Sequence, residues 1–211
     1  MRHALALALA LLAGPLWAEG EKAGDFDYFV LSLGWSPNWC ALTGDARHDD
    51  QCDPRHDFSF TLHGLWPQYE SGWPSYCHTA AKDPTRSQSE AMKDIMGSAG
   101  LAWYEWKKHG RCAGLSADRY YAASRQAYES ITIPPVFLNL PKDVKIPAQV
   151  VEEAFLEVNP QLDRSMITIT CDRGMIDEAR ICLTKDLTPR PCGQDAARDC
   201  RMKDALMEAV R

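Results

Sequence analysis

The sequence lacks an apolar run long enough to cross a membrane. Its longest run, Ala4 to Ala13, ends at Gly14-Pro15, whereas a membrane-spanning helix needs about 20 apolar residues. The run follows the basic segment Met1-Arg2-His3 and precedes the small residue Ala18, which is the pattern of a secretory signal peptide. We therefore predict that residues 1–18 are a signal peptide.

Internal repeats, Gly/Ser linkers and long charge blocks are also missing, so nothing in the sequence divides the rest of the chain. Residues 19–211 fit one hydrophobic core, and we predict a single domain there. The chain has 29 acidic against 23 basic residues, a formal net charge of −6. An acidic chain disfavours tight, nonspecific binding to duplex DNA, which needs a basic surface to displace counterions.

No Cys-x-x-Cys pair is present, and the two closest cysteines are eight residues apart. All eight cysteines lie beyond residue 18. An even number of cysteines in an exported chain favours four disulfides. A zinc site with thiolate ligands is the alternative, and the wide spacing disfavours it.

Several runs with period-2 or helical spacing predict the secondary structure. The strand candidates lie at residues 26–33, 57–62, 166–170 and 179–184. The helix candidates lie at residues 88–98, with a capping box formed by Ser87 and Glu90, from Ser116 onward, and from Pro147 to Asn159. Helices in the middle and strands at both ends predict an α+β fold with a mostly antiparallel sheet.

His63 is the first candidate for chemistry. Period-2 alternation places Thr61 and His63 on the face opposite Phe60 and Leu62. We expect the strand to end there and Gly64 to turn the chain. The alternative is a partly buried histidine that bonds a backbone carbonyl and has no chemical role.

The second candidate segment runs from Trp103 to Cys112. In a helix, Glu105 and His109 lie about 40° apart on one face, Lys108 flanks that face, and Gly110 suits a C-cap. The alternative is an exposed Glu-His pair, which contributes only a few tenths of a kcal/mol. Trp103 and Trp106 argue against a merely solvated face, and we expect both to pack.

Two histidines with a glutamate and a lysine suit general acid-base catalysis at a phosphate. One imidazole removes a proton from the nucleophile, the other protonates the leaving oxygen, and a cation stabilises the charge on the phosphate oxygens. RNA carries its own nucleophile, the 2′-OH, beside each phosphate. A metal site formed by His63, Glu105 and His109 is the competing interpretation.

Two segments resemble the active-site signatures of the RNase T2 family, secreted acid ribonucleases that include the plant self-incompatibility ribonucleases. They are FTLHGLWP at residues 60–67 and YEWKKHGRC at residues 104–112. LSLGWSPNWC at residues 31–40 is similar to the family's first strand. The chain is thereby identified as a bacterial-type member. The resemblance implies the family's α+β fold and the disulfides Cys77–Cys112, Cys171–Cys200 and Cys182–Cys192, which leaves Cys40–Cys52.

The resemblance also implies roles for site residues. His109 is the expected base toward the 2′-OH and His63 the expected acid, while Glu105 and Lys108 polarise the phosphate and stabilise the pentacoordinate state. Trp66 matches the family's base-stacking aromatic. Without the resemblance, the sequence is equally consistent with Trp66 as a core residue.

Two positions depart from the family pattern. Tyr104 stands where many members have a histidine that contacts phosphate, and Arg111 where threonine is common. Tyr104 is therefore kept as a substrate-binding candidate. Because the acid-base pair is intact, the departure at residue 104 affects affinity and rate more than reaction type.

The sequence thus predicts a secreted or periplasmic endoribonuclease. It is expected to cleave single-stranded RNA through a 2′,3′-cyclic phosphate to 3′-phosphate ends, without a metal or other cofactor. We expect a monomer with no stable DNA binding and no membrane association after signal removal. The alternatives are a catalytically weak RNA-binding effector on the same scaffold and a metal-dependent phosphodiesterase.

Overall fold

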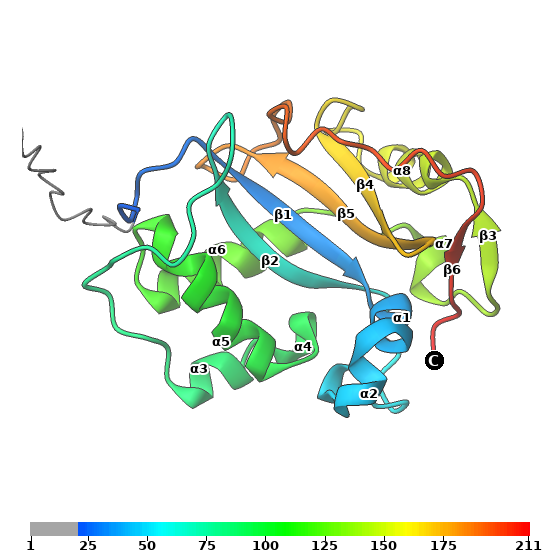
Figure 1. The fold of residues 1–211 in the computed structure, drawn as a ribbon, viewed down its shortest axis with the longest axis horizontal. Coiled ribbons are helices and arrows are strands. Elements are labelled where there is room, and N and C mark those ends of the chain that lie inside the picture. Colours follow the sequence, from blue (N-terminus) through cyan, green and yellow to red (C-terminus); the bar gives the residue numbers. More distant parts are fainter. Residues whose placement is uncertain (1–20) are drawn as a thin grey trace, which may run out of the picture.

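A six-stranded, mostly antiparallel sheet forms the centre of the computed structural model (Figure 1), which describes residues 21–211. The predicted signal peptide lies outside the described residues. The strand order is β2-β1-β5-β6-β3, and β4 pairs with β5. One contact is parallel, between β5 and β6. The strands are β1 Tyr28–Trp35, β2 Phe60–Gln68, β3 Val144–Ile146, β4 Ile167–Asp172, β5 Met175–Leu183 and β6 Ala205–Met207.

Helices pack around this sheet at different places. Figure 1 shows α4 and α5 on the side of β2, with α3 packed against α5, and α8 near β4. The helices are α1 Ser36–Trp39, α2 Asp45–Arg47, α3 Arg86–Glu90, α4 Lys93–Met96, α5 Ala99–Lys108, α6 Ala117–Glu129, α7 Pro135–Leu138 and α8 Ala148–Val158. A π-helical turn, Cys40–Gly44, and two 3-10 turns, Asp50–Cys52 and Gly110–Ala113, complete the set. The predicted α+β fold is confirmed. No helix within residues 21–211 is long and apolar enough to cross a membrane.

The continuous apolar sequence of β1 is explained by burial on both faces of the sheet. Leu31, Leu33 and Trp35 belong to the main hydrophobic core. Tyr28 and Val30, which alternate with them, belong to a smaller cluster on the other face. A strand covered on both faces needs apolar residues at successive positions rather than an alternating pattern. The second face of β1 is also the one that carries the candidate site described below.

Two of the three predicted helices are confirmed. The Ser116 side chain accepts a hydrogen bond from the Arg119 amide and caps α6, and α8 ends before Asn159. The continuous helix predicted at residues 88–98 is wrong. Thr85 rather than Ser87 forms the capping box, with Gln88, and the chain breaks between α3 and α4. The apolar spacing indicates which side of the segment is buried in the core, but it does not indicate that the helix is interrupted between α3 and α4.

Four disulfides join the eight cysteines: Cys40–Cys52, Cys77–Cys112, Cys171–Cys200 and Cys182–Cys192. Three of them are the pairs that the family resemblance implied, and Cys40–Cys52 is the pair that was left. Cys77–Cys112 spans 35 residues and ties the segment after β2 to the 3-10 turn after α5. The chain that follows each histidine-bearing element is therefore covalently linked to the other.

Candidate active site

A β-bulge in β2 determines how His63 is presented. The register with β1 shifts between Ser32, opposite Gly64, and Leu33, opposite Leu62, so that His63 is the extra residue. Residues three apart in a regular strand face opposite sides, but one extra residue brings them to the same side. The His63 and Trp66 ring centroids are accordingly 5.2 Å apart. The predicted strand end at Gly64 is wrong, because β2 continues through Gln68.

Gly64 allows two side chains to approach the backbone closely, and it does not form a turn. A Cβ atom at this position would lie 2.2 Å from Glu105 Oε2 and 2.3 Å from Trp66 Nε1. Both atoms belong to the site, so a side chain at residue 64 would displace them. The glycine in the signature is therefore required by packing.

Helix α5 supplies the site residues of the second segment. Ser98 caps its start by accepting a hydrogen bond from the Leu101 amide. Trp106 enters the main core, whereas Glu105 and His109 are buried where α5 faces the site, with 2 % and 4 % exposure. This burial excludes the exposed Glu-His pair that the sequence left open.

The structure corrects two expectations for this segment. The α5 C-cap is His109 rather than Gly110, and the left-handed residue is Gly114, at φ +71°, after the 3-10 turn. Gly110 instead packs closely, since a Cβ there would lie 2.6 Å from Trp106. Trp103 is 44 % exposed, so the packing role expected for it is wrong.

Trp66 connects the two histidine-bearing segments. Its indole Nε1 donates a hydrogen bond of 2.7 Å to Glu105 Oε2, and its ring stacks on the His109 ring at 5.2 Å and 28°. The other carboxylate oxygen, Glu105 Oε1, lies 3.7 Å from His63 Nε2. Trp66 therefore contacts three side chains predicted for the site: His63, Glu105 and His109.

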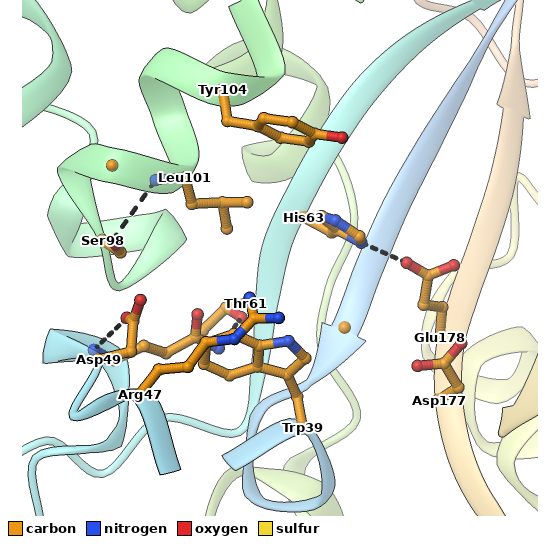
Figure 2. A pocket seen from close by; sticks show the side chains of 13 residues that line it. Trp39, Arg47, Asp49, Thr61, His63, Ser98, Leu101, Tyr104, Asp177 and Glu178 are labelled. Atoms are coloured by element: carbon orange, nitrogen blue, oxygen red, sulfur yellow. Dashed lines mark hydrogen bonds and ion pairs between the residues drawn. The ribbon is translucent and has the colours of Figure 1, made fainter. Parts of the chain in front are cut away.

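Strand β5 contributes a carboxylate that the sequence analysis did not select. His63 Nδ1 bonds the Glu178 carboxylate (Figure 2), and the other oxygen of Glu178 accepts a hydrogen bond of 2.7 Å from Arg180 Nε. The available signal was the alternation of charged with apolar residues in Glu178-Ala179-Arg180-Ile181. Period 2 places Glu178 and Arg180 on one face, but the predicted strand began only at residue 179.

The two histidines have opposite electrostatic environments. Burial lowers the pKa of His63, but the charge and hydrogen bond of Glu178 outweigh it and raise this pKa to about 9. Burial, together with the nearby Lys108 and His63 charges, lowers the pKa of His109 to about 3. At neutral pH one imidazole is therefore protonated and the other neutral. Burial also raises the pKa of Glu105.

Two neighbouring cavities of about 500 and 430 Å³ meet at His63. The larger one is also lined by Trp66, Lys108 and His109. Tyr104, 43 % exposed, lines both cavities. In Figure 2 its ring lies on the same side of the smaller cavity as Leu101.

The structure thus brings together all six predicted side chains, His63, Trp66, Tyr104, Glu105, Lys108 and His109. Arg111 does not line either cavity. It forms hydrogen bonds of 2.7 and 2.9 Å to Asp83, which also accepts Trp106 Nε1. The departure from the family pattern at residue 111 therefore belongs to a structural ion pair.

The described residues contain one group of three potential metal ligands close enough to hold one ion: Cys40, Asp45 and Cys52. Its two sulfur atoms are joined in a disulfide, so they offer no thiolate. His63, Glu105 and His109 do not form such a group within residues 21–211. The site therefore fits acid-base chemistry better than the competing metal interpretation.

Comparison with known proteins places this chain in a family. The model described as "Ribonuclease T2 family" matches residues 26–192. A ribonuclease of Aeromonas hydrophila is 40 % identical over 122 residues, which cover 56 % of this chain and 54 % of that protein. The chain spans about half the length of the curated relatives it matches.

Solved structures show the same fold. An RNase-related protein from Calystegia sepium has a TM-score of 0.65 at 18 % identity, covering 90 % of this chain and all of that one. Trichomaglin, described as an S-like ribonuclease, has a TM-score of 0.68 at 20 % identity, covering 89 % of this chain and all of that one.

Proposed function

The chain belongs to the Ribonuclease T2 family, and we propose that it is an endoribonuclease that cleaves single-stranded RNA. The reaction is transphosphorylation: the 2′-OH attacks the adjacent phosphorus, the P–O5′ bond breaks, and a 2′,3′-cyclic phosphate forms. Slower hydrolysis then gives a 3′-phosphate. The observation that carries the proposal is a pair of histidines that line one cavity in different surroundings, His63 bonded to the Glu178 carboxylate and His109 buried beside Lys108.

In this proposal His109 is the general base and His63 the general acid. A neutral imidazole can accept the 2′-OH proton, and the lowered pKa of His109 keeps it neutral. A protonated imidazole can give its proton to the leaving 5′-oxygen, and the raised pKa of His63 keeps it charged. Such matched groups contribute about 10² to 10⁴-fold each to the rate.

Lys108 and Glu105 are proposed to act on the phosphate. Lys108 lines the larger cavity beside His109 and can stabilise negative charge as it develops on the phosphate oxygens. Glu105 lies under the same cavity, held by Trp66. Trp66 is proposed to stack on a base with the part of its ring left half-buried at the cavity wall.

No step of this mechanism needs a metal ion, and the nucleophile belongs to the substrate. The test is incubation of the mature protein with an RNA and with a DNA of the same sequence, in EDTA. We expect RNA cleavage, intact DNA and 2′,3′-cyclic ends early in the reaction. Activity that is lost in EDTA and restored by zinc would support the metal-dependent phosphodiesterase. RNA binding without cleavage would support the effector.

We also propose that the chain is exported to the periplasm or the medium as a monomer. Four disulfides support an oxidising compartment, and the sequence predicts a signal peptide at residues 1–18. Cell fractionation of the tagged full-length chain tests the export, and N-terminal sequencing of the mature protein tests the cleavage site.

A further inference from the structure

The contact between His63 and Glu178 links two strands that are not neighbours. His63 is on β2 and Glu178 on β5, and β1 lies between these strands. In Figure 2 the His63 ring points toward the Glu178 carboxylate. Glu178 is only 3 % exposed, and such a buried carboxylate needs partners for its charge. It has two, His63 Nδ1 and Arg180.

The residue on β1 between the two strands leaves room for this contact. Gly34 pairs with Thr61 of β2 and with Glu178 of β5. Directly paired residues lie on the same face of a sheet, so a side chain at residue 34 would rise between β2 and β5. A Cβ at Gly34 would meet nothing within 4 Å. The space above Gly34 is therefore open, and His63 and Glu178 meet on this face of the sheet.

The bond fixes which nitrogen of His63 faces the substrate. An ionised carboxylate can only accept hydrogen bonds, so His63 Nδ1 must carry a proton and donate it to the hydrogen bond with Glu178. The other nitrogen, Nε2, lies on the side of Glu105, 3.7 Å from its Oε1. Arg180 holds the second oxygen of Glu178, so the carboxylate cannot rotate away without losing a charged partner.

We propose that Glu178, held by Arg180, is the positioning residue that orients His63 and keeps it protonated for its role as the acid. This inference rests on the proposed function, since it explains how that function's acid is maintained. It assigns a task to a residue on β5 outside both signature segments. Glu178 acts through His63 and is not itself proposed to touch substrate.

The charges around His63 support this assignment. Glu178, Asp177 and Arg180 face it from β5, and Glu105, Lys108 and His109 from α5. Burial disfavours the charged ring, but Glu178 provides the largest opposing effect, and Glu105 and Asp177 add to it. The His63 and Arg180 charges in turn outweigh burial and hold the pKa of Glu178 well below its usual range.

The test compares Glu178→Gln with Glu152→Gln in the mature protein. Glu152 is the matched control because it is also a buried glutamate, 7 % exposed and paired with Arg164, but lies on α8 outside both cavities. The main measurement is an NMR titration of the His63 imidazole without substrate. We expect the pKa of His63 to be raised to about 9 in the parent and in Glu152→Gln. In Glu178→Gln it should fall by at least one pH unit.

Kinetics give a second readout that a merely structural role would not move. The alkaline limb of kcat/KM should shift to lower pH in Glu178→Gln by the same amount as the NMR titration. KM at pH 5 should stay within about twofold, because the glutamine amide oxygen can still accept the hydrogen bond from His63 Nδ1 and hold the ring in place. Glu152→Gln should leave the limb where it is.

The inference is overturned if His63 titrates at the same pH in Glu178→Gln as in the parent. If that variant does not fold, the parent alone decides: an ordinary pKa near 6.5, or a neutral ring protonated on Nε2, overturns it. The titration needs no enzymatic activity. A protein that does not cut RNA but shows the raised His63 pKa would refute the proposed function and leave the His63–Glu178 pair standing.

Discussion

Trp66 donates its indole proton to Glu105 at 2.7 Å, and this one bond joins strand β2 to helix α5 beneath the candidate active site. Glu105 is 2 % exposed, so the bond satisfies a carboxylate that has little access to water. The same indole ring stacks on His109. Trp66 thus holds both Glu105 and His109 in place at the site.

Replacing Trp66 with phenylalanine keeps an aromatic ring but removes the donor to Glu105. A buried acceptor left unsatisfied costs about 1–3 kcal/mol, so we expect Trp66→Phe to lower the free energy of unfolding by that amount. Urea denaturation at pH 7 measures it. Trp103→Phe on α5 is the control, since Trp103 is 44 % exposed, and it should change stability by less than about 0.5 kcal/mol. Equal losses in the two variants would contradict the role of the bond.

His63→Ala and His109→Ala should each reduce kcat/KM by about 10² to 10⁴-fold, because each removes one proton-transfer group. The double variant should be little worse than either single one, since the pair acts as a unit. His78 is exposed and outside both cavities, so His78→Ala should retain parental activity. If folded His63→Ala keeps more than about a tenth of the activity, the assignment of the acid is wrong.

The pH dependence follows from the two shifted values. His109 must be neutral to act as the base, so kcat/KM should rise as pH rises through about 3. His63 must be protonated to act as the acid, so kcat/KM should fall as pH rises through about 9. Initial rates from about pH 2 to pH 10, with folding followed by circular dichroism, check both limbs. An alkaline limb near the ordinary histidine pKa of 6.5 would show that Glu178 does not control His63.

The Cys77–Cys112 disulfide closes a loop of 35 residues. The chain-entropy model gives such a loop roughly 4 kcal/mol of stabilisation, and we expect the Cys77→Ala, Cys112→Ala double variant to lose about that much, together with activity. Cys182–Cys192 closes only 10 residues, so its removal should cost about 3 kcal/mol by the same model. Thiol titration of the oxidised parent should find no free cysteine. Two or more free thiols would contradict the four-disulfide framework.

Tyr104 is exposed at the meeting point of the two cavities, where a histidine would be charged at acidic pH. Charge-assisted hydrogen bonds are about twice as strong as neutral ones. We expect Tyr104→His to lower KM about fivefold below about pH 6.5 and to do little at neutral pH. Tyr104→Phe is the control for the hydroxyl. If KM and kcat of both variants match the parent at acidic and neutral pH, residue 104 lies outside the phosphate site.

The sequence by itself determined the local features of this protein. Ser116 and Asn159 mark helix boundaries through side-chain and backbone chemistry that acts within a few residues, and the structure places them where the sequence predicted. The signature segments also identified His63, Glu105 and His109 as neighbours, since their spacing and residue types resemble those of a known family.

Only the tertiary structure decided how these residues are arranged. The bulge at His63 is defined by the way β2 pairs with β1 on both sides of it. Neither strand specifies this pairing alone. Glu178 meets His63 across 115 residues of sequence, through the order β2-β1-β5. Strand order and register depend on pairing between distant segments. The signature segments therefore found the two histidines, whereas the folded sheet supplied the carboxylate that distinguishes one from the other.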